Sequence, residues 1–205
     1  MGRFKVKKQS TFIDMTAMSD VTVLLLTFFM LTSQFVKPEP IKVNAPQSVS
    51  DIKIPETNLV TVVIESTGRV VMGTSTPQEM KAILDGMNSK YQLGLSANEV
   101  IQLAQDPMIG VPLSQIKAYA KNDKDERDKL LQHASNRGIL CDSTNNEFKE
   151  WIKVMREAHP DMRIAIKADA TTPYATIKHV MNSLQDLQEN RYNLITALKG
   201  EEPVE

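Results

Sequence analysis

The sequence predicts an α+β protein with one transmembrane helix, and three patterns along its 205 residues support this fold class. The densest apolar run, residues 21–36, follows a basic N-terminus and predicts a membrane span. A stretch with four prolines comes next and predicts an extended tether. Segments typical of strands and helices then alternate along the rest of the chain, which predicts a small sheet covered by helices.

These patterns divide the chain into five predicted parts, of which the fourth carries a helical insertion at about residues 76–142. In chain order, the parts are an N-terminal tail at 1–12, a transmembrane helix at 13–36, a tether at 37–58, an α+β domain at 59–198 and an acidic tail at 199–205.

The composition argues against several classes of function. Lys and Arg number 24 against 25 Asp and Glu, so no basic surface for nucleic acid is expected. The single cysteine, Cys141, cannot form an intramolecular disulfide, and we interpret it as a small apolar filler. The three histidines lack the spacing of metal ligands, so no metal site and no cofactor are predicted. Because no nucleophile–base arrangement or phosphate-binding loop is found, the chain is not expected to be an enzyme.

The apolar run reaches the roughly 20 residues needed to cross a bilayer only if it starts near Ile13 and includes Asp20. Four basic residues precede it with no acidic residue before Asp14, which places the N-terminus in the cytoplasm. A cleaved signal peptide has a similar outline. An aspartate beside the apolar core and the lack of a small-residue cleavage site at 31–34 favour an uncleaved anchor instead.

Asp20 is the most informative residue of the span, because a carboxylate inside a bilayer costs about 2.5–3.5 kcal/mol on insertion scales. A single helix provides neither a protein interior nor a water-filled cavity for this group, so a partner protein is implied. On a helical wheel, Asp20 shares a face with Thr16 and Thr27. Desolvation favours the neutral form of the Asp20 carboxyl group, whereas hydrogen bonds from hydroxyl groups favour its charged form. Reversible protonation is therefore predicted. The threonines either line a proton path or bond back to their own helix, and Asp14 is interpreted as an interfacial N-cap rather than a second titrating group.

The first half of the domain contains clear local signals. β-Branched residues on both sides of Ser66-Thr67-Gly68 predict a hairpin over residues 59–72. A capping box and an N1 proline at Thr76-Pro77-Gln78-Glu79 predict a helix to about residue 89, and Ser96-Ala97-Asn98-Glu99 repeats the box. A charged helix is expected at 121–136. This middle region has too little apolar periodicity for a core of its own, and residues 41–43 of the tether are candidates for an added edge strand.

The second half predicts a helix at 145–158, a strand at 162–168, a helix from Thr172-Pro173 and a last strand at 192–198. The first of these helices is strongly amphipathic, and Trp151 on its apolar face is interpreted as a core residue.

Two stretches together resemble the ExbD/TolR family of inner-membrane energy transducers: "IDMTAMSDVTVLLLTFFMLT" and "HPDMRIAIKADATTPYATIKHVMNSLQDLQENRYNLIT". The first is similar to the family's approach to its membrane span, except that Ala17 stands where proline is usual. The second is similar to the family's strand, Pro-Tyr helix and final strand. Residues 76–142 resemble the insertion of a longer subtype, whose role the sequence leaves open among docking a partner, covering a dimer seam and decorating the fold.

The resemblance implies that Asp20 is the proton-carrying carboxylate and that Asp14 and Thr16 match the family's preceding Asx and Thr. It implies a homodimer anchored in the bacterial inner membrane, with its helices in contact with lipid and inside a multi-span ExbB/TolQ-like ring, and with a periplasmic domain that acts on a TonB-like protein. The expected function is to harvest the proton motive force for TonB-dependent transport. The alternatives are a TolR-like subunit of the Tol-Pal system and an anchored periplasmic binding module without a proton role.

Overall fold

The computed structural model describes residues 15–32, 41–48, 57–133, 135–142 and 145–198. The chain divides into two compact units, residues 1–37 and 38–205, which are treated separately below. The described part of the first unit is one helix, α1 (Met15–Thr32). The predicted tails 1–12 and 199–205 lie outside the described residues.

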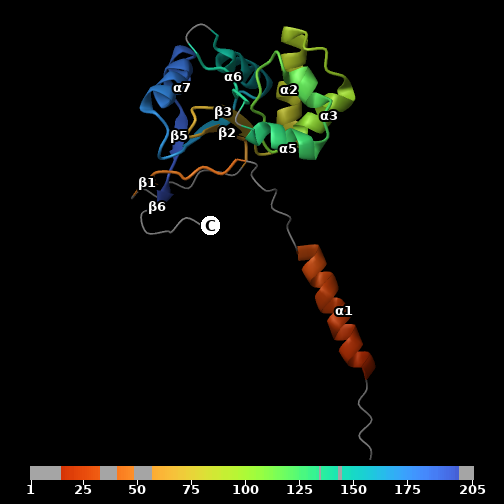
Figure 1. The fold of residues 1–205 in the computed structure, drawn as a ribbon. Coiled ribbons are helices and arrows are strands. Elements are labelled where there is room, and N and C mark those ends of the chain that lie inside the picture. The colour runs from red at the N-terminus through yellow and green to blue at the C-terminus, as the bar shows by residue number, and fades with distance from the viewer. Residues whose placement is uncertain (1–14, 33–40, 49–56, 134, 143–144, 199–205) are drawn as a thin grey trace, which may run out of the picture. The chain divides into compact units, whose positions relative to one another are not determined.

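The second unit is built on a four-stranded mixed sheet with the strand order β3-β2-β4-β5 (Figure 1). The β2–β3 pair is antiparallel and confirms the predicted hairpin, whereas the β2–β4 and β4–β5 pairs are parallel. The parallel pairs need crossovers, and α7 (Tyr174–Asp186) provides one of them between β4 and β5. The strands are β2 (Leu59–Ile64), β3 (Val70–Thr74), β4 (Arg163–Ala168) and β5 (Tyr192–Ile195).

Six helices complete the described part of this unit, and two of them begin at the predicted capping boxes. The helix predicted from Thr172-Pro173 begins at Tyr174, without a side-chain cap. Both capping boxes form: the Thr76 and Ser96 side chains accept bonds from the backbone amides of Glu79 and Glu99, whose carboxylates accept bonds in return. The helices are α2 (Pro77–Tyr91), α3 (Ala97–Ala104), α4 (Ile116–Ala120), α5 (Lys124–Gln132), α6 (Glu147–Ala158) and α7 (Tyr174–Asp186).

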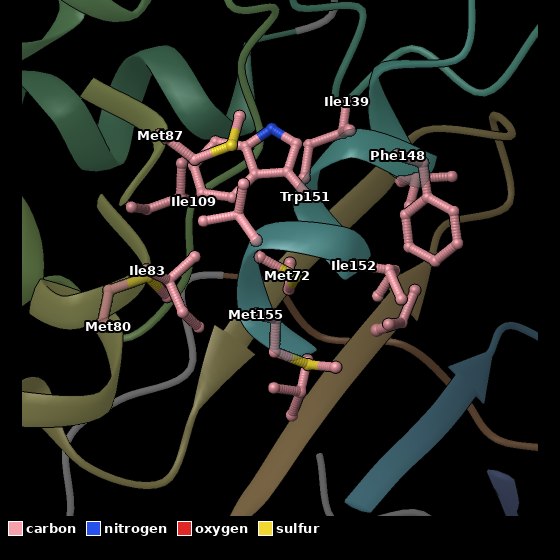
Figure 2. Close-up of a cluster of buried hydrophobic side chains, with 14 of the residues drawn as sticks. Met72, Met80, Ile83, Met87, Ile109, Ile139, Phe148, Trp151, Ile152 and Met155 are labelled. Atoms are coloured by element: carbon pink, nitrogen blue, oxygen red, sulfur yellow. The ribbon is translucent and has the colours of Figure 1, made fainter. Parts of the chain in front are cut away.

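The main core lies on the face of the sheet that carries Val60, Val62 and Ile64, which we call the first face. Trp151 of α6 is fully buried there, which confirms its predicted core position. Figure 2 shows side chains of the middle region around it, among them Met87 of α2. The helices of the middle region therefore bury their few apolar side chains in the same core as the sheet. The residues of this region in the core are Met80, Ile83, Leu84, Met87, Leu95, Val100, Leu103, Ala104, Ile109, Val111, Ile116, Tyr119, Ala120 and Ile139.

The opposite face of the sheet, which we call the second face, has a much smaller apolar cluster. It consists of Val63 and Val71 from the sheet, Met108 and Leu131 from the middle region, and Ile41 from the tether. The prediction that residues 41–43 form an edge strand is wrong, because Ile41 packs its side chain into this cluster instead. The tether forms its strand later.

That tether strand is β1 (Gln47–Ser48), which pairs in parallel with β6 (Ala197–Leu198). The predicted strand at 192–198 is therefore divided at Thr196 into β5, which pairs with β4, and β6. The predicted helix at 121–136 is also shorter, as α5 ends at Gln132. His133 at the end of the helix has an extended backbone, and further along the chain the Ile139 amide donates to Val70 O (2.8 Å) at the sheet edge.

Candidate functional site

The candidate site lies on α1, an 18-residue helix that differs from the other helices in having no buried residue within the described structure. Its length of about 27 Å is close to the roughly 30 Å hydrocarbon core of a bilayer. By length and composition it is the one helix among the described residues able to cross a membrane, a test that a signal sequence near the N-terminus also passes. Several of its apolar side chains, such as Leu24 and Phe28, are more than half exposed.

Four hydroxyl side chains of α1 donate to carbonyl oxygens of the same helix. Ser19 Oγ donates to Met15 O (2.9 Å), Thr22 Oγ1 to Met18 O (2.6 Å), Thr27 Oγ1 to Leu24 O (2.9 Å) and Thr32 Oγ1 to Phe28 O (2.7 Å). Such bonds satisfy hydroxyl donors without water, so these residues fit an apolar surrounding at little cost. For Thr27, the structure shows the backbone bond that was weighed against a proton path, although the oxygen of this hydroxyl can still accept a bond.

Asp20 differs from these hydroxyl groups in its hydrogen bonding. Its carboxylate makes no hydrogen bond or ion pair with any described residue, although it has oxygens that accept several. Asp20 and Thr27 are seven residues apart, so they lie on one side of α1, about 10.5 Å apart along its axis. Thr16, four residues before Asp20, is on the same side. The predicted supporting residue Asp14 lies outside the described residues.

Among its described residues, the second unit offers no comparable site. No group of three or more His, Cys, Asp or Glu side chains that could hold a metal ion occurs among the described residues. Burial raises the pKa of the Cys141 thiol, and its sulfur lies 3.7 Å from Ser183 Oγ, as expected for a structural position. The residue is half-buried and packs against the main core, in agreement with its interpretation as a filler.

A buried ion pair within the middle region was not predicted from the sequence. Arg127 of α5 donates from Nε and Nη2 to the two carboxylate oxygens of Asp106 (2.7 and 2.9 Å), and both side chains are almost completely buried. The hydrogen bonding that Arg127 donates to the Asp106 carboxylate raises the pKa of the Arg127 guanidinium. Nη1 of Arg127 also donates to Asn122 O (2.6 Å), so the pair joins three segments of the middle region. Sequence periodicity carries no signal for a pair of charges 21 residues apart.

Asp169 has two structural roles, one in a local turn and one in a contact with the tether. Its Oδ1 accepts bonds from the amide (2.9 Å) and hydroxyl (2.6 Å) of Thr171, which form the turn. Its Oδ2 accepts the backbone amide of Asn44 in the tether (3.0 Å). The bonds from Thr171, followed by the bond from Asn44, hold the pKa of the Asp169 carboxyl below its usual range.

Comparison with known proteins supports the resemblance found in the sequence. A family model described as "Biopolymer transport protein ExbD/TolR" matches residues 7–199. "Biopolymer transport protein exbD2" of Vibrio cholerae serotype O1 is 39% identical over 46 residues. This match covers 22% of the present chain and 34% of that protein, so it spans about a third of the relative's length. No solved structure gives a significant match.

Proposed function

The chain belongs to the ExbD/TolR family of biopolymer transport proteins, and from this premise we propose that it is the proton-harvesting subunit of an inner-membrane ExbB–ExbD-type motor. Members of this family are membrane-anchored, non-enzymatic proteins of energy-transducing transport systems. In the proposed function, α1 spans the inner membrane with the N-terminus in the cytoplasm, and the α+β unit lies in the periplasm.

The proposal depends on one observation. Asp20 is an ionisable group on a helix in which four hydroxyl groups donate hydrogen bonds to the helix's own backbone. An inert anchor has no use for such a group, since inserting it costs about 2.5–3.5 kcal/mol. The cost falls when the group faces a protein interior or a water-filled cavity. Asp20 therefore faces the inside of a multi-span ExbB/TolQ-like ring that holds two copies of α1, whose remaining apolar surface contacts lipid.

The proposed mechanism is alternate neutralisation and recharging of Asp20. Transfer of one proton across the membrane yields about 2.3 kcal/mol per 100 mV and about 1.4 kcal/mol per pH unit of gradient. This free energy is large enough to bias the position of the α1 dimer inside its ring. Thr27 accepts a hydrogen bond along the proton path, while Thr16 and Asp14 support the start of the helix. The periplasmic unit passes the movement to a TonB-like protein.

The Exb pathway is favoured over the Tol pathway because the matched relative carries the name exbD2. Deletion of the gene is expected to abolish energy-dependent uptake through the outer membrane and to leave the envelope intact. Leakage of periplasmic proteins with normal uptake would instead assign the chain to the TolR branch.

The decisive experiment replaces Asp20 with Asn, which keeps the size of the side chain and removes its charge. We expect Asp20→Asn to insert and co-purify with the ring protein and to reduce proton-motive-force-dependent uptake to the level of the deletion strain. The matched control is Ser19→Ala on the neighbouring residue, whose hydroxyl bonds only to its own helix among the described residues, and it is expected to keep full uptake. An assembled Asp20→Asn protein with normal uptake would refute the proton-carrying role, as would an Asp20→Leu protein that remains active.

A further inference from the structure

A cavity lined mainly by polar residues, which we call the polar cavity, lies at the end of the sheet where β4 and β5 begin. Its walls come from the last turn of α6, from segments 160–162 and 188–191, and from the first residues of the two strands. Its volume is about 930 Å³, near the upper end of the roughly 300–1,000 Å³ range of ligand sites. The polar cavity can therefore hold more than a single small ion.

Two charged side chains of the polar cavity form part of its wall. Arg156 donates from Nε and Nη2 to the two carboxylate oxygens of Glu189 (2.7 and 2.6 Å). Its Nη1 donates to the carbonyl oxygen of Pro160 and to Met162 O (3.0 Å). All three nitrogens of this guanidinium group are thus bound to protein acceptors. Arg156 therefore joins α6 to the segments before β4 and before β5.

Two other arginines of the polar cavity have no such partner. Arg163 and Arg191 are exposed, and neither side chain makes a hydrogen bond or an ion pair within the described residues. The two arginines are neighbours, because each directly precedes a member of the paired residues Ile164 and Tyr192. Adjacent strands are about 4.8 Å apart, so the two like charges repel each other. An anion bound to both guanidinium groups would remove this cost.

The remaining charged group of the polar cavity is Asp161, which is exposed and has no ion-pair partner in the described part of the chain. Because Arg156 and Glu189 neutralise each other, the unpaired charges are those of Arg163, Arg191 and Asp161. Two positive charges therefore remain against one negative charge. This balance favours an anionic occupant.

Side-chain amides distinguish between the classes of anionic occupant. Gln188, Asn190 and Asn193 line the polar cavity, and their side chains make no hydrogen bond with any described residue. An amide group both donates and accepts hydrogen bonds, as does each peptide group of a protein chain. A lipid phosphodiester only accepts them, so it would leave the amide oxygens without a donor. Two guanidinium groups beside three free amides therefore fit an acidic peptide better than a phosphate group.

We propose that the polar cavity binds an acidic segment of a partner protein. Carboxylate groups of the segment bind Arg163 and Arg191, and its peptide groups bind the neighbouring side-chain amides. A guanidinium group can hold a carboxylate through two parallel hydrogen bonds, which adds geometric specificity to the attraction between charges. In the proposed function this partner is periplasmic, but the binding itself does not depend on proton transfer by Asp20.

The test measures binding of a fluorescent peptide of alternating glutamate and glycine to the full chain in detergent micelles, by fluorescence anisotropy at low salt. Arg163→Gln and Arg191→Gln should each weaken binding about fivefold, as expected for the loss of one partly exposed ion pair. Asp161→Asn should strengthen binding about twofold, because it removes a repulsive charge. All three side chains are exposed, so the variants should keep the fold, which circular dichroism checks.

The matched control is Arg137→Gln in the middle region. Arg137 is exposed, has no ion-pair partner among the described residues and does not line the polar cavity. This variant makes the same change in net charge as the two cavity variants, and its affinity should equal that of the wild type. An equal loss of affinity in Arg137→Gln would overturn the proposal, because the attraction would then be non-specific.

Three further results would also overturn it: no binding of the peptide by the wild type, unchanged affinity in both cavity variants, or binding by Asp161→Asn that is no tighter than that of the wild type. Competition experiments decide the class of ligand. Inorganic phosphate and vesicles of phosphatidylglycerol should displace the peptide less effectively than an unlabelled copy of it does. Equal displacement by either would assign the polar cavity to phosphate groups and overturn its assignment to an acidic peptide.

Discussion

The two faces of the sheet differ in how many parts of the chain cover them. On the first face, α2, α6 and α7 pack over β2, β3 and β4 in one continuous core that includes Trp151 (Figure 2). On the second face, five buried residues form a separate cluster, to which the tether contributes Ile41. The large number of buried apolar side chains on the first face is expected of the region that keeps the domain folded. The second face is held by few contacts, and such regions open locally at lower free energy than the core.

The largest effect is expected from Trp151→Ala on the first face. Trp151 is fully buried, and its Nε1 has no hydrogen-bond partner among the described residues, so the whole loss comes from packing. Replacing such a residue costs about 3–5 kcal/mol of the free energy of unfolding. Denaturant titration followed by circular dichroism measures this loss.

The control for this substitution is Ile101→Ala on α3, because Ile101 is 44% exposed. Its effect should stay within about 0.5 kcal/mol. Equal losses for the two variants would mean that the first face is not the main source of stability.

A smaller effect is expected from Gly73→Ala, which crowds the second face. The added methyl group would meet Pro107 O at 2.5 Å, so the backbone that carries Met108 must move. Overpacking of this kind costs about 1–3 kcal/mol. The same titration should show this loss, and hydrogen exchange should place it in residues 107–110. Thr61→Ala, at the half-buried position paired with Gly73, is the control and should cost less. If Thr61→Ala costs as much as Gly73→Ala, the close approach of Pro107 is not the cause.

The smallest effect is expected from the loss of the Asp169 charge, which bonds to Asn44 of the tether, as the pH falls. The pKa of Asp169 is lowered in the folded protein by bonds from Thr171 and Asn44, so ionised Asp169 stabilises the folded state. This contribution is complete above the unfolded pKa of about 4 and is lost as pH falls through the lower folded pKa. Three further charged groups, Lys42, Glu65 and Arg69, line the same cavity as Asp169.

The measurement compares the unfolding free energies of the wild type and Asp169→Asn between pH 6 and pH 3. The difference between the two proteins should shrink as the pH falls, since protonation removes the charge that the substitution also removes. A difference that stays constant over this range would rule out a role for the ionised carboxylate.

Local signals in the sequence were sufficient for most elements. The hairpin, both capping boxes, the amphipathic helix with Trp151 and the apolar helix with Asp20 depend on interactions within a few residues, and the structure contains each of them. The same applies to the α+β fold class, because the order of strands and helices restricts the possible layers.

The tertiary structure alone decided the contacts between distant segments. The Asn44–Asp169 bond joins residues 125 apart, and the Asp106–Arg127 pair is buried by helices whose packing no periodicity predicts. The bond from the Ile139 amide to Val70 O joins the chain after α5 to the edge of β3. The sequence by itself determined most helices and strands and which helix is apolar enough to cross a membrane, because these depend on neighbouring residues. Only the fold decided that the middle region shares the main core and supports the tether, because those contacts arise when separate segments pack together.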